Sequence, residues 1–154
     1  MNASIDAVRV AGTAQGPVGI VVLTVEDESD VVPIFIGLEE ATSIARGMSA
    51  ADLPRPFTHD LCLDVVEELG GRVDRVVISD IEDSTYIADL HLNTPREDVV
   101  VDARPSDSLA LAARTNAPIE VAEEVFESGR EDAEEFEELD DIREFEEGGG
   151  VEMP

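Results

Sequence analysis

The alternation of apolar and polar residues divides the chain into two successive groups of strands, each closed by a helix. Residues 18–26 are apolar and largely β-branched, as in a buried strand, and residues 85–93 alternate between two faces, as in a half-buried strand. Residues 38–48 and 105–114 instead carry apolar side chains at helical spacing. The remaining expected strands are residues 4–11, 31–37, 72–81, 98–102 and 119–121.

These elements follow one another in a repeated order. Three strands and a helix come first, a linking helix at residues 58–69 follows, and then three strands and a helix recur. The repeat is visible at an offset of 67 positions, where Glu40-Ala41 and Ile44-Ala45 correspond to Asp107-Ser108 and Leu111-Ala112. The order predicts an α+β fold in which duplicated β-β-β-α units form a mixed sheet with packed helices.

The chain is expected to divide into an α+β domain at residues 1–128 and an acidic, largely disordered C-terminal tail at residues 129–154. A short helix at residues 122–128 closes the domain. Apolar residues recur at every third position of the tail, which indicates a weak amphipathic helix; they are Phe136, Leu139, Ile142 and Phe145. We favour a solvated tail over a partner-binding or autoinhibitory arm, with disorder from Gly148 onwards.

The charge balance indicates the salt concentration in which the protein works. The chain carries 37 acidic residues against 10 basic ones, all arginine, for a formal net charge of −27. We interpret this as adaptation to molar salt, where a Debye length of about 3 Å screens repulsion between surface carboxylates. We therefore expect a cytoplasmic protein of a salt-loving organism that loosens in dilute buffer. In such salt the net charge does not exclude nucleic acid, but binding must come from local contacts.

The sequence gives no sign of a disulfide framework or of a membrane segment. A single cysteine, Cys62, lies beside Leu61 on the linking helix, where a buried structural thiol is favoured. No segment approaches the roughly 20 apolar residues of a membrane span, and no signal-peptide pattern is present. We therefore expect no interaction with a membrane.

Two short polar clusters, at residues 55–60 and 102–108, hold the candidate chemistry. Each opens a helix and contains an arginine, a proline, a hydroxyl residue and an aspartate. If the fold brings them together, one patch holds two guanidinium groups, several carboxylates and the imidazole of His59, which can exchange protons near neutral pH. The alternative is two well-capped helices with no chemical role.

The second cluster and its repeat partner offer ligands for an anion or a cation. Arg104 could bind a phosphate in a bidentate manner, and Asp102 and Asp107 could share a divalent cation. Glu40, at the equivalent helix start, could add a carboxylate. An internal Arg–Asp pair that fixes the helix against the sheet has equal weight, and an exposed glutamate is typical of a solvated face.

The same residues resemble a known family, the bifunctional nucleases, formerly a domain of unknown function. The resemblance covers roughly residues 1–127, departs from the usual pattern at Phe57 and Ser108, and looks like that of a halophilic archaeal member. It implies an α+β domain, often dimeric, with nuclease activity on DNA and RNA. The matching runs, in order, are Val32-Pro33-Ile34-Phe35-Ile36-Gly37 with Glu40-Ala41, Arg55-Pro56-Phe57-Thr58-His59-Asp60-Leu61, and Asp102-Ala103-Arg104-Pro105-Ser106-Asp107.

Two functions remain open at this point. In the first, a phosphodiesterase, Arg55 and Arg104 hold the scissile phosphate, and His59 acts as general acid or base, oriented by Asp60. The cofactor is Mg²⁺ or Mn²⁺, and its expected ligands are Asp102, Asp107 and Glu40. In the second, a non-catalytic module uses the same patch to bind an anion or a regulatory partner. Both require the two helix starts to converge in space.

Overall fold

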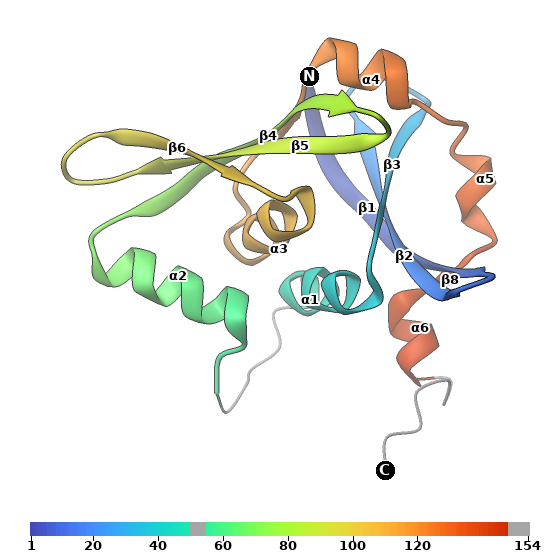
Figure 1. Ribbon diagram of the computed structural model, residues 1–154, viewed down its shortest axis with the longest axis horizontal. Coiled ribbons are helices and arrows are strands. Elements are labelled where there is room, and N and C mark those ends of the chain that lie inside the picture. The colour runs from blue at the N-terminus through green and yellow to red at the C-terminus, as the bar shows by residue number, and fades with distance from the viewer. Residues whose placement is uncertain (50–54, 148–154) are drawn as a thin grey trace.

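The computed structural model describes residues 1–49 and 55–147, and its central feature is one mixed β-sheet (Figure 1). The strand order is β3-β2-β1-β7-β4-β5-β6, and β8 pairs separately with β1. The strands are β1 (Asn2–Thr13), β2 (Gly16–Val25), β3 (Val31–Ile36), β4 (Arg72–Glu82), β5 (Thr85–Asn93), β6 (Asp98–Ala103), β7 (Ile119–Val121) and β8 (Asp140–Asp141). The bounds of β1 to β7 differ from the predicted ones by at most a few residues at each end, and β8 was not predicted.

The sheet consists of two antiparallel three-stranded meanders joined by one short strand. Strands β1, β2 and β3 form the first meander, and β4, β5 and β6 form the second. Strand β7 lies between them, antiparallel to β1 and parallel to β4. Each meander is followed by a helix, which confirms the predicted α+β architecture of duplicated β-β-β-α units. Pro33 lies in the edge strand β3, where its missing N–H costs no sheet hydrogen bond.

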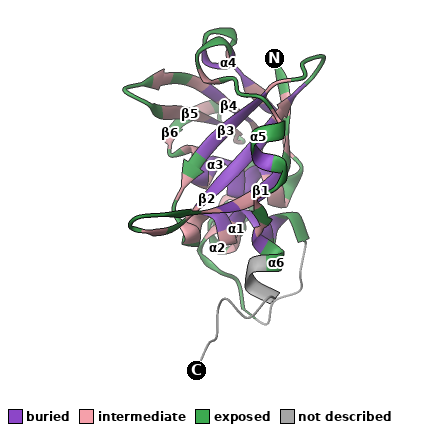
Figure 2. Ribbon diagram, turned by 90° about the vertical axis from the view of Figure 1, so that its right-hand side faces the viewer, coloured by how far each residue is buried: buried purple, intermediate pink, exposed green. Residues whose placement is uncertain are grey.

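The helices α1 (Leu38–Ser49) and α3 (Pro105–Thr115) pack against each other and against the sheet (Figure 1). Ile44 of α1 and Leu109 of α3 are completely buried among strand residues such as Leu23 and Ile78. Figure 2 shows the buried residues concentrated in the strands and in these two helices, with the hairpin ends exposed. None of the helices in the described part of the chain has the length and apolar content needed to cross a membrane.

The expected disordered tail is ordered as far as the structure describes it. After α4 (Glu123–Gly129), the chain forms α5 (Glu134–Glu137), β8 and α6 (Ile142–Glu147). Phe136 packs on Ile20 and Val22, on the face of β2 opposite the main core, and Ile142 joins that core. The prediction of a largely disordered tail is therefore wrong up to Glu147, because its sparse apolar side chains cover sheet surface that would otherwise be exposed. Residues 148–154, also predicted to be disordered, lie outside the described residues.

The helix α2 (Thr58–Glu68) presents its apolar stripe to solvent. Leu61, Val65 and Leu69, one turn apart, are all more than half exposed, while Leu63 is the buried residue of the helix. The prediction of a buried thiol at Cys62 is wrong, because this residue is exposed. With so little apolar burial, α2 depends on polar contacts for its position.

Candidate functional site

The starts of α2 and α3 converge on the carboxylate of Asp107. One oxygen, Oδ1, lies 2.8 Å from Nε2 of His59 and accepts a hydrogen bond of 3.1 Å from Nη2 of Arg104. The other oxygen accepts a 2.8 Å bond from Nε of Arg104. The two helix starts therefore converge, as both candidate functions require. Local structure explains the positions, since Pro105 fixes the first turn of α3 and Asp107 follows in that turn.

The second ring nitrogen of His59 contacts a residue that the sequence did not single out. Nδ1 lies 2.6 Å from Oγ of Ser43, in the middle of α1. The result is a continuous chain of Ser43, His59 and Asp107, drawn from three different helices. The local sequence offers no signal for Ser43, because a serine inside an amphipathic helix shows nothing of the side chain it faces.

Arg114 is a second residue that the sequence analysis did not single out, and it anchors the Ser43–His59–Asp107 hydrogen bonds. Arg114 of α3 donates to Oγ of Ser43 at 3.2 Å, to the Ser43 carbonyl at 3.0 Å and to Oδ1 of Asp60 at 2.7 Å. Its side chain is only 7 % exposed. Arg114 therefore ties α1, α2 and α3 together at one point, and it holds Asp60 away from the role predicted for it. Asp107, rather than Asp60, contacts the imidazole.

These partners assign the tautomer of neutral His59. The ionised carboxylate of Asp107 can only accept, so the proton of neutral His59 lies on Nε2, which donates to Asp107. Nδ1 is then the acceptor, and the Ser43 hydroxyl donates to it while its oxygen accepts from Arg114. Both ring nitrogens are thus hydrogen-bonded. The Ser43 hydroxyl is the group positioned to give a proton to Nδ1.

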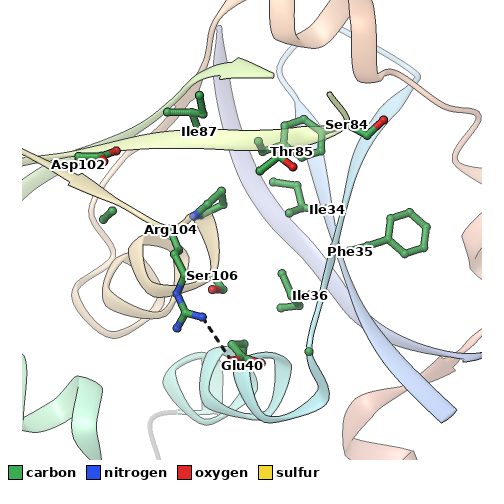
Figure 3. A pocket seen from close by; sticks show the side chains of 14 residues that line it. Ile34, Phe35, Ile36, Glu40, Ser84, Thr85, Ile87, Asp102, Arg104 and Ser106 are labelled. Carbon is green, nitrogen blue, oxygen red and sulfur yellow. Dashed lines mark ion pairs between the residues drawn. The ribbon is translucent and has the colours of Figure 1, made fainter. Parts of the chain in front are cut away.

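Arg104 also lines an open pocket of about 630 Å³, within the range of small-ligand sites. Figure 3 shows its guanidinium directed toward Glu40 of α1, with Ile34 and Ile36 of β3 on the opposite wall and Phe35 directed away. The Arg104–Glu40 pair is loose, at 3.6 Å. Arg104 is 64 % exposed, so it is both fixed by Asp107 and accessible from the pocket.

The predicted metal ligands Asp102, Asp107 and Glu40 are not gathered into one group of three. Asp102, at the end of β6, lines the pocket, but both oxygens of Asp107 are bonded to His59 and Arg104. Across residues 1–49 and 55–147, no three His, Cys, Asp or Glu side chains are grouped to hold a metal ion. The binding of Mg²⁺ or Mn²⁺ by Asp102, Asp107 and Glu40 therefore stays a prediction, and we derive no step through a metal. Arg55 is exposed and makes no hydrogen bond or ion pair with another described residue.

The site holds two carboxyl groups in their ionised form. The hydrogen bond from Arg104 lowers the pKa of Asp107, and the contact with His59 adds to this against the opposing effect of burial. Burial alone would raise the pKa of Asp60, but the hydrogen bonds from Arg114 and the Phe57 amide outweigh it and leave that pKa lowered. Both groups therefore stabilise the fold through their charged forms.

We expect this site to make folding sensitive to acid. Because the folded-state pKa values of Asp107 and Asp60 lie below those of the unfolded chain, their stabilisation is complete above about pH 4 and is lost as the pH falls through the lowered values. Asp107→Asn should flatten the dependence of the urea midpoint on pH below pH 5, measured by circular dichroism in molar KCl. Asp64→Asn, an exposed change on α2, serves as control, and parallel curves for Asp107→Asn and wild type would contradict the assignment.

Comparisons with known proteins agree on one family. The sequence model of the bifunctional nuclease domain matches residues 21–134. An uncharacterized protein of Mycobacterium tuberculosis is 43 % identical over 94 residues, which cover 61 % of this chain and 56 % of that protein. Bifunctional nuclease 1 of rice (Oryza sativa) is 28 % identical over 105 residues, or 66 % of this chain and 32 % of the rice protein.

A second plant protein shows the same relationship. Bifunctional nuclease 2 of Arabidopsis thaliana is 28 % identical over 109 residues, which cover 68 % of this chain and 33 % of that protein. The aligned part thus spans about half the length of the mycobacterial relative and a third of the plant relatives. The relatives come from a bacterium and from plants, and they do not support the expected halophilic archaeal origin.

Proposed function

Because this chain belongs to the bifunctional nuclease domain family, we propose that it hydrolyses phosphodiester bonds of DNA, RNA or both. The observation that carries the proposal is the convergence of Arg104 and His59 on a single oxygen of Asp107. A phosphate-binding cation then lies next to a group that can transfer a proton, and phosphodiester cleavage can use both. The names of the plant relatives, as bifunctional nucleases, point the same way.

Arg104 is the phosphate-binding group in this proposal. Its Nε and Nη2 atoms are bonded to Asp107, which fixes the plane of the guanidinium, while Nη1 faces Glu40 across 3.6 Å. A phosphate in the pocket would replace this loose carboxylate contact with a charge-assisted hydrogen bond. Salt screens the strongly negative surface at the same time, so the local contact at Arg104 decides whether a polyanion binds.

His59 and Asp107 form the proton-transfer unit. The carboxylate of Asp107 stabilises the imidazolium that forms when His59 takes up a proton, and it holds the ring in one orientation. The His59 side chain is 17 % exposed and that of Asp107 34 %, so the pair is partly shielded from water. Shielding strengthens the interaction between the two charges relative to that at an open surface.

The proposal is tested by cleavage of labelled single- and double-stranded DNA and RNA in molar KCl. We expect Arg104→Ala to lower kcat/KM by about 100-fold, the scale found when one donor to a developing anion is removed. Arg96→Ala, an exposed arginine in the turn after β5, is the matched control and should cleave as wild type does. Equal cleavage by Arg104→Ala and Arg96→Ala would contradict the proposal. Binding that is lost in Arg104→Ala, without turnover in wild type, would favour the non-catalytic anion-binding module.

The form that we propose for the active protein is a homodimer. The apolar stripe of α2, with Leu61, Val65 and Leu69 exposed, is supported on its flank by Phe57, which is 44 % exposed. Apolar side chains aligned on one helix face are typical of an interaction surface. In a homodimer, the exposed stripe of one copy would be buried against the same apolar stripe of the other.

A further inference from the structure

We propose that Ser43 is the nucleophile of this site and that its Oγ carries the phosphoryl group between two steps of cleavage. The inference rests on the proposed function and adds a covalent intermediate to it. Ser43 has the three features of an activated serine: a base within hydrogen-bond distance, a carboxylate behind that base, and a cationic donor at its oxygen.

The hydrogen bond of Ser43 differs from those of its neighbours on the same helix. Thr42 and Ser49 direct their hydroxyls to carbonyls one turn back in α1, at 2.9 and 3.0 Å, as hydroxyl residues inside helices commonly do. Ser43 instead reaches across to α2 and contacts Nδ1 of His59 at 2.6 Å. Its hydroxyl therefore serves an arrangement between helices rather than its own helix.

The occupancy of the imidazole makes Ser43 the group from which His59 takes a proton. Nε2 of His59 is bonded to Asp107, and Nδ1 faces the Ser43 hydroxyl. Because Nδ1 is the only ring nitrogen that can accept a proton, His59 acts as a base by removing the proton of the Ser43 hydroxyl. The two nitrogens are used in the reverse of the usual order in serine hydrolases, but the relay from hydroxyl to imidazole to carboxylate is the same.

Arg114 supplies the charge that favours reaction at Oγ. Its Nη2 donates to this oxygen at 3.2 Å, and Asp60 and two backbone carbonyls hold the guanidinium in place. When the Ser43 proton moves to His59, negative charge develops on Oγ beside this fixed cation. A donor already in position stabilises such a charge without reorganisation.

The reaction then balances in two displacements at phosphorus. In the first, Oγ of Ser43 forms the bond to phosphorus, its proton moves to Nδ1 of His59, and the bond to one nucleoside oxygen breaks. The leaving oxygen takes a proton from a water molecule and leaves hydroxide. In the second, hydroxide attacks phosphorus from the vacated side, the Oγ–phosphorus bond breaks, and Oγ recovers its proton from His59. The products are a phosphate monoester end and a free hydroxyl end.

Labelling with an alkyl fluorophosphonate in molar KCl tests the inference, because this reagent modifies activated serines irrespective of nuclease turnover. We expect mass spectrometry to find the label on Ser43 of wild type and at least ten-fold less label on His59→Ala. Ser43→Ala should lose both the label and at least about 10³-fold in cleavage rate, while its urea midpoint stays close to that of wild type. Ser49→Ala, on the same helix, is the matched control and should label and cleave normally.

The outcomes separate this inference from the proposed function. Cleavage by wild type with no label on Ser43, or full cleavage by Ser43→Ala, would overturn the covalent intermediate and leave the nuclease proposal standing. Equal labelling of Ser43 in wild type and His59→Ala would show that the serine is merely accessible, and would also overturn the inference. Labelling that depends on His59 in a protein that cleaves no nucleic acid would support the activated serine and overturn the proposed substrate.

Discussion

Substituting His59 with alanine should lower kcat for phosphodiester cleavage by roughly 10³-fold, within the range typical of a lost general acid or base. Two effects combine in this variant. The proton acceptor disappears, and the hydroxyl of Ser43 and the carboxylate of Asp107 lose their common partner. The effect should fall on kcat more than on KM, because the phosphate contact at Arg104 remains.

A second substitution at position 59 separates proton transfer from the hydrogen bonds that hold the side chain in place. Glutamine at position 59 can still hydrogen-bond to neighbouring polar groups, but it cannot take up a proton. We therefore expect His59→Gln to retain more of the wild-type urea midpoint than His59→Ala and to be as inactive. His91→Ala, the other histidine of the chain, is the control in the same assay and should leave the rate unchanged. Recovery of cleavage in His59→Gln would assign His59 a purely structural role.

Arg114→Met should be the most destabilising single change at this site, at about 3 kcal/mol or more of unfolding free energy. The substitution keeps an apolar stem of similar length but removes the donors to Ser43, Asp60 and the Ala110 carbonyl. The Asp60 side chain that remains is 28 % exposed, so most of the expected loss comes from the four hydrogen bonds of the buried guanidinium, each worth about 1 kcal/mol or more. Since α2 has little apolar burial, this loss should release that helix first.

Urea unfolding in molar KCl, followed by circular dichroism, measures the effect of Arg114→Met. The double variant Arg114→Met/Asp60→Asn removes the uncompensated carboxylate and should recover part of the lost free energy. Arg72→Met, at the exposed start of β4, controls for the loss of a positive charge from an acidic protein. A loss below about 1 kcal/mol in Arg114→Met, as at a surface pair, would mean that α2 is not held by this arginine.

Most of the fold followed from periodicity because that signal is local. The strand at residues 85–93 and the helix after Pro105 could be placed from alternation, helical spacing and the first-turn proline alone. The meeting of His59 and Arg104 did not follow from periodicity, because His59 lies on the linking helix α2, outside the two repeated units. It entered the sequence analysis only as a condition of the candidate site.

The failures share a different cause. Ser43 and Arg114 form hydrogen bonds with residues 16 to 71 positions away in the sequence. The residues next to them in the sequence do not indicate these partners. The stripe of α2 has the spacing of a core-facing helix, yet Leu63 is the residue that joins the core and the stripe lies in solvent. Spacing predicts that a helix has an apolar face, but tertiary packing decides whether that face meets the core.

The tail was misread through charge. High acidity is typical of disorder, but Phe136 and Ile142 were enough to fold the described part of the tail onto the sheet. The metal site was predicted from Asp102 and Asp107, at a strand end and the following helix start; it stays a prediction, and in the structure Asp107 is hydrogen-bonded to His59 and Arg104. In a chain with 37 acidic residues, the number of nearby carboxylates carries little information about metal binding.

The short strand β7 joins the two β-β-β-α units, and the proposed chemistry depends on this junction. Ser43 belongs to the first β-β-β-α unit, Asp107 to the second and His59 to the connecting helix, so neither unit holds a working set of groups by itself. Three residues of β7 and the contact between α1 and α3 keep the units in register. If the proposed function holds, a slip at that seam would abolish cleavage while each unit kept its own secondary structure. Cleavage would then report whether the two repeats have assembled.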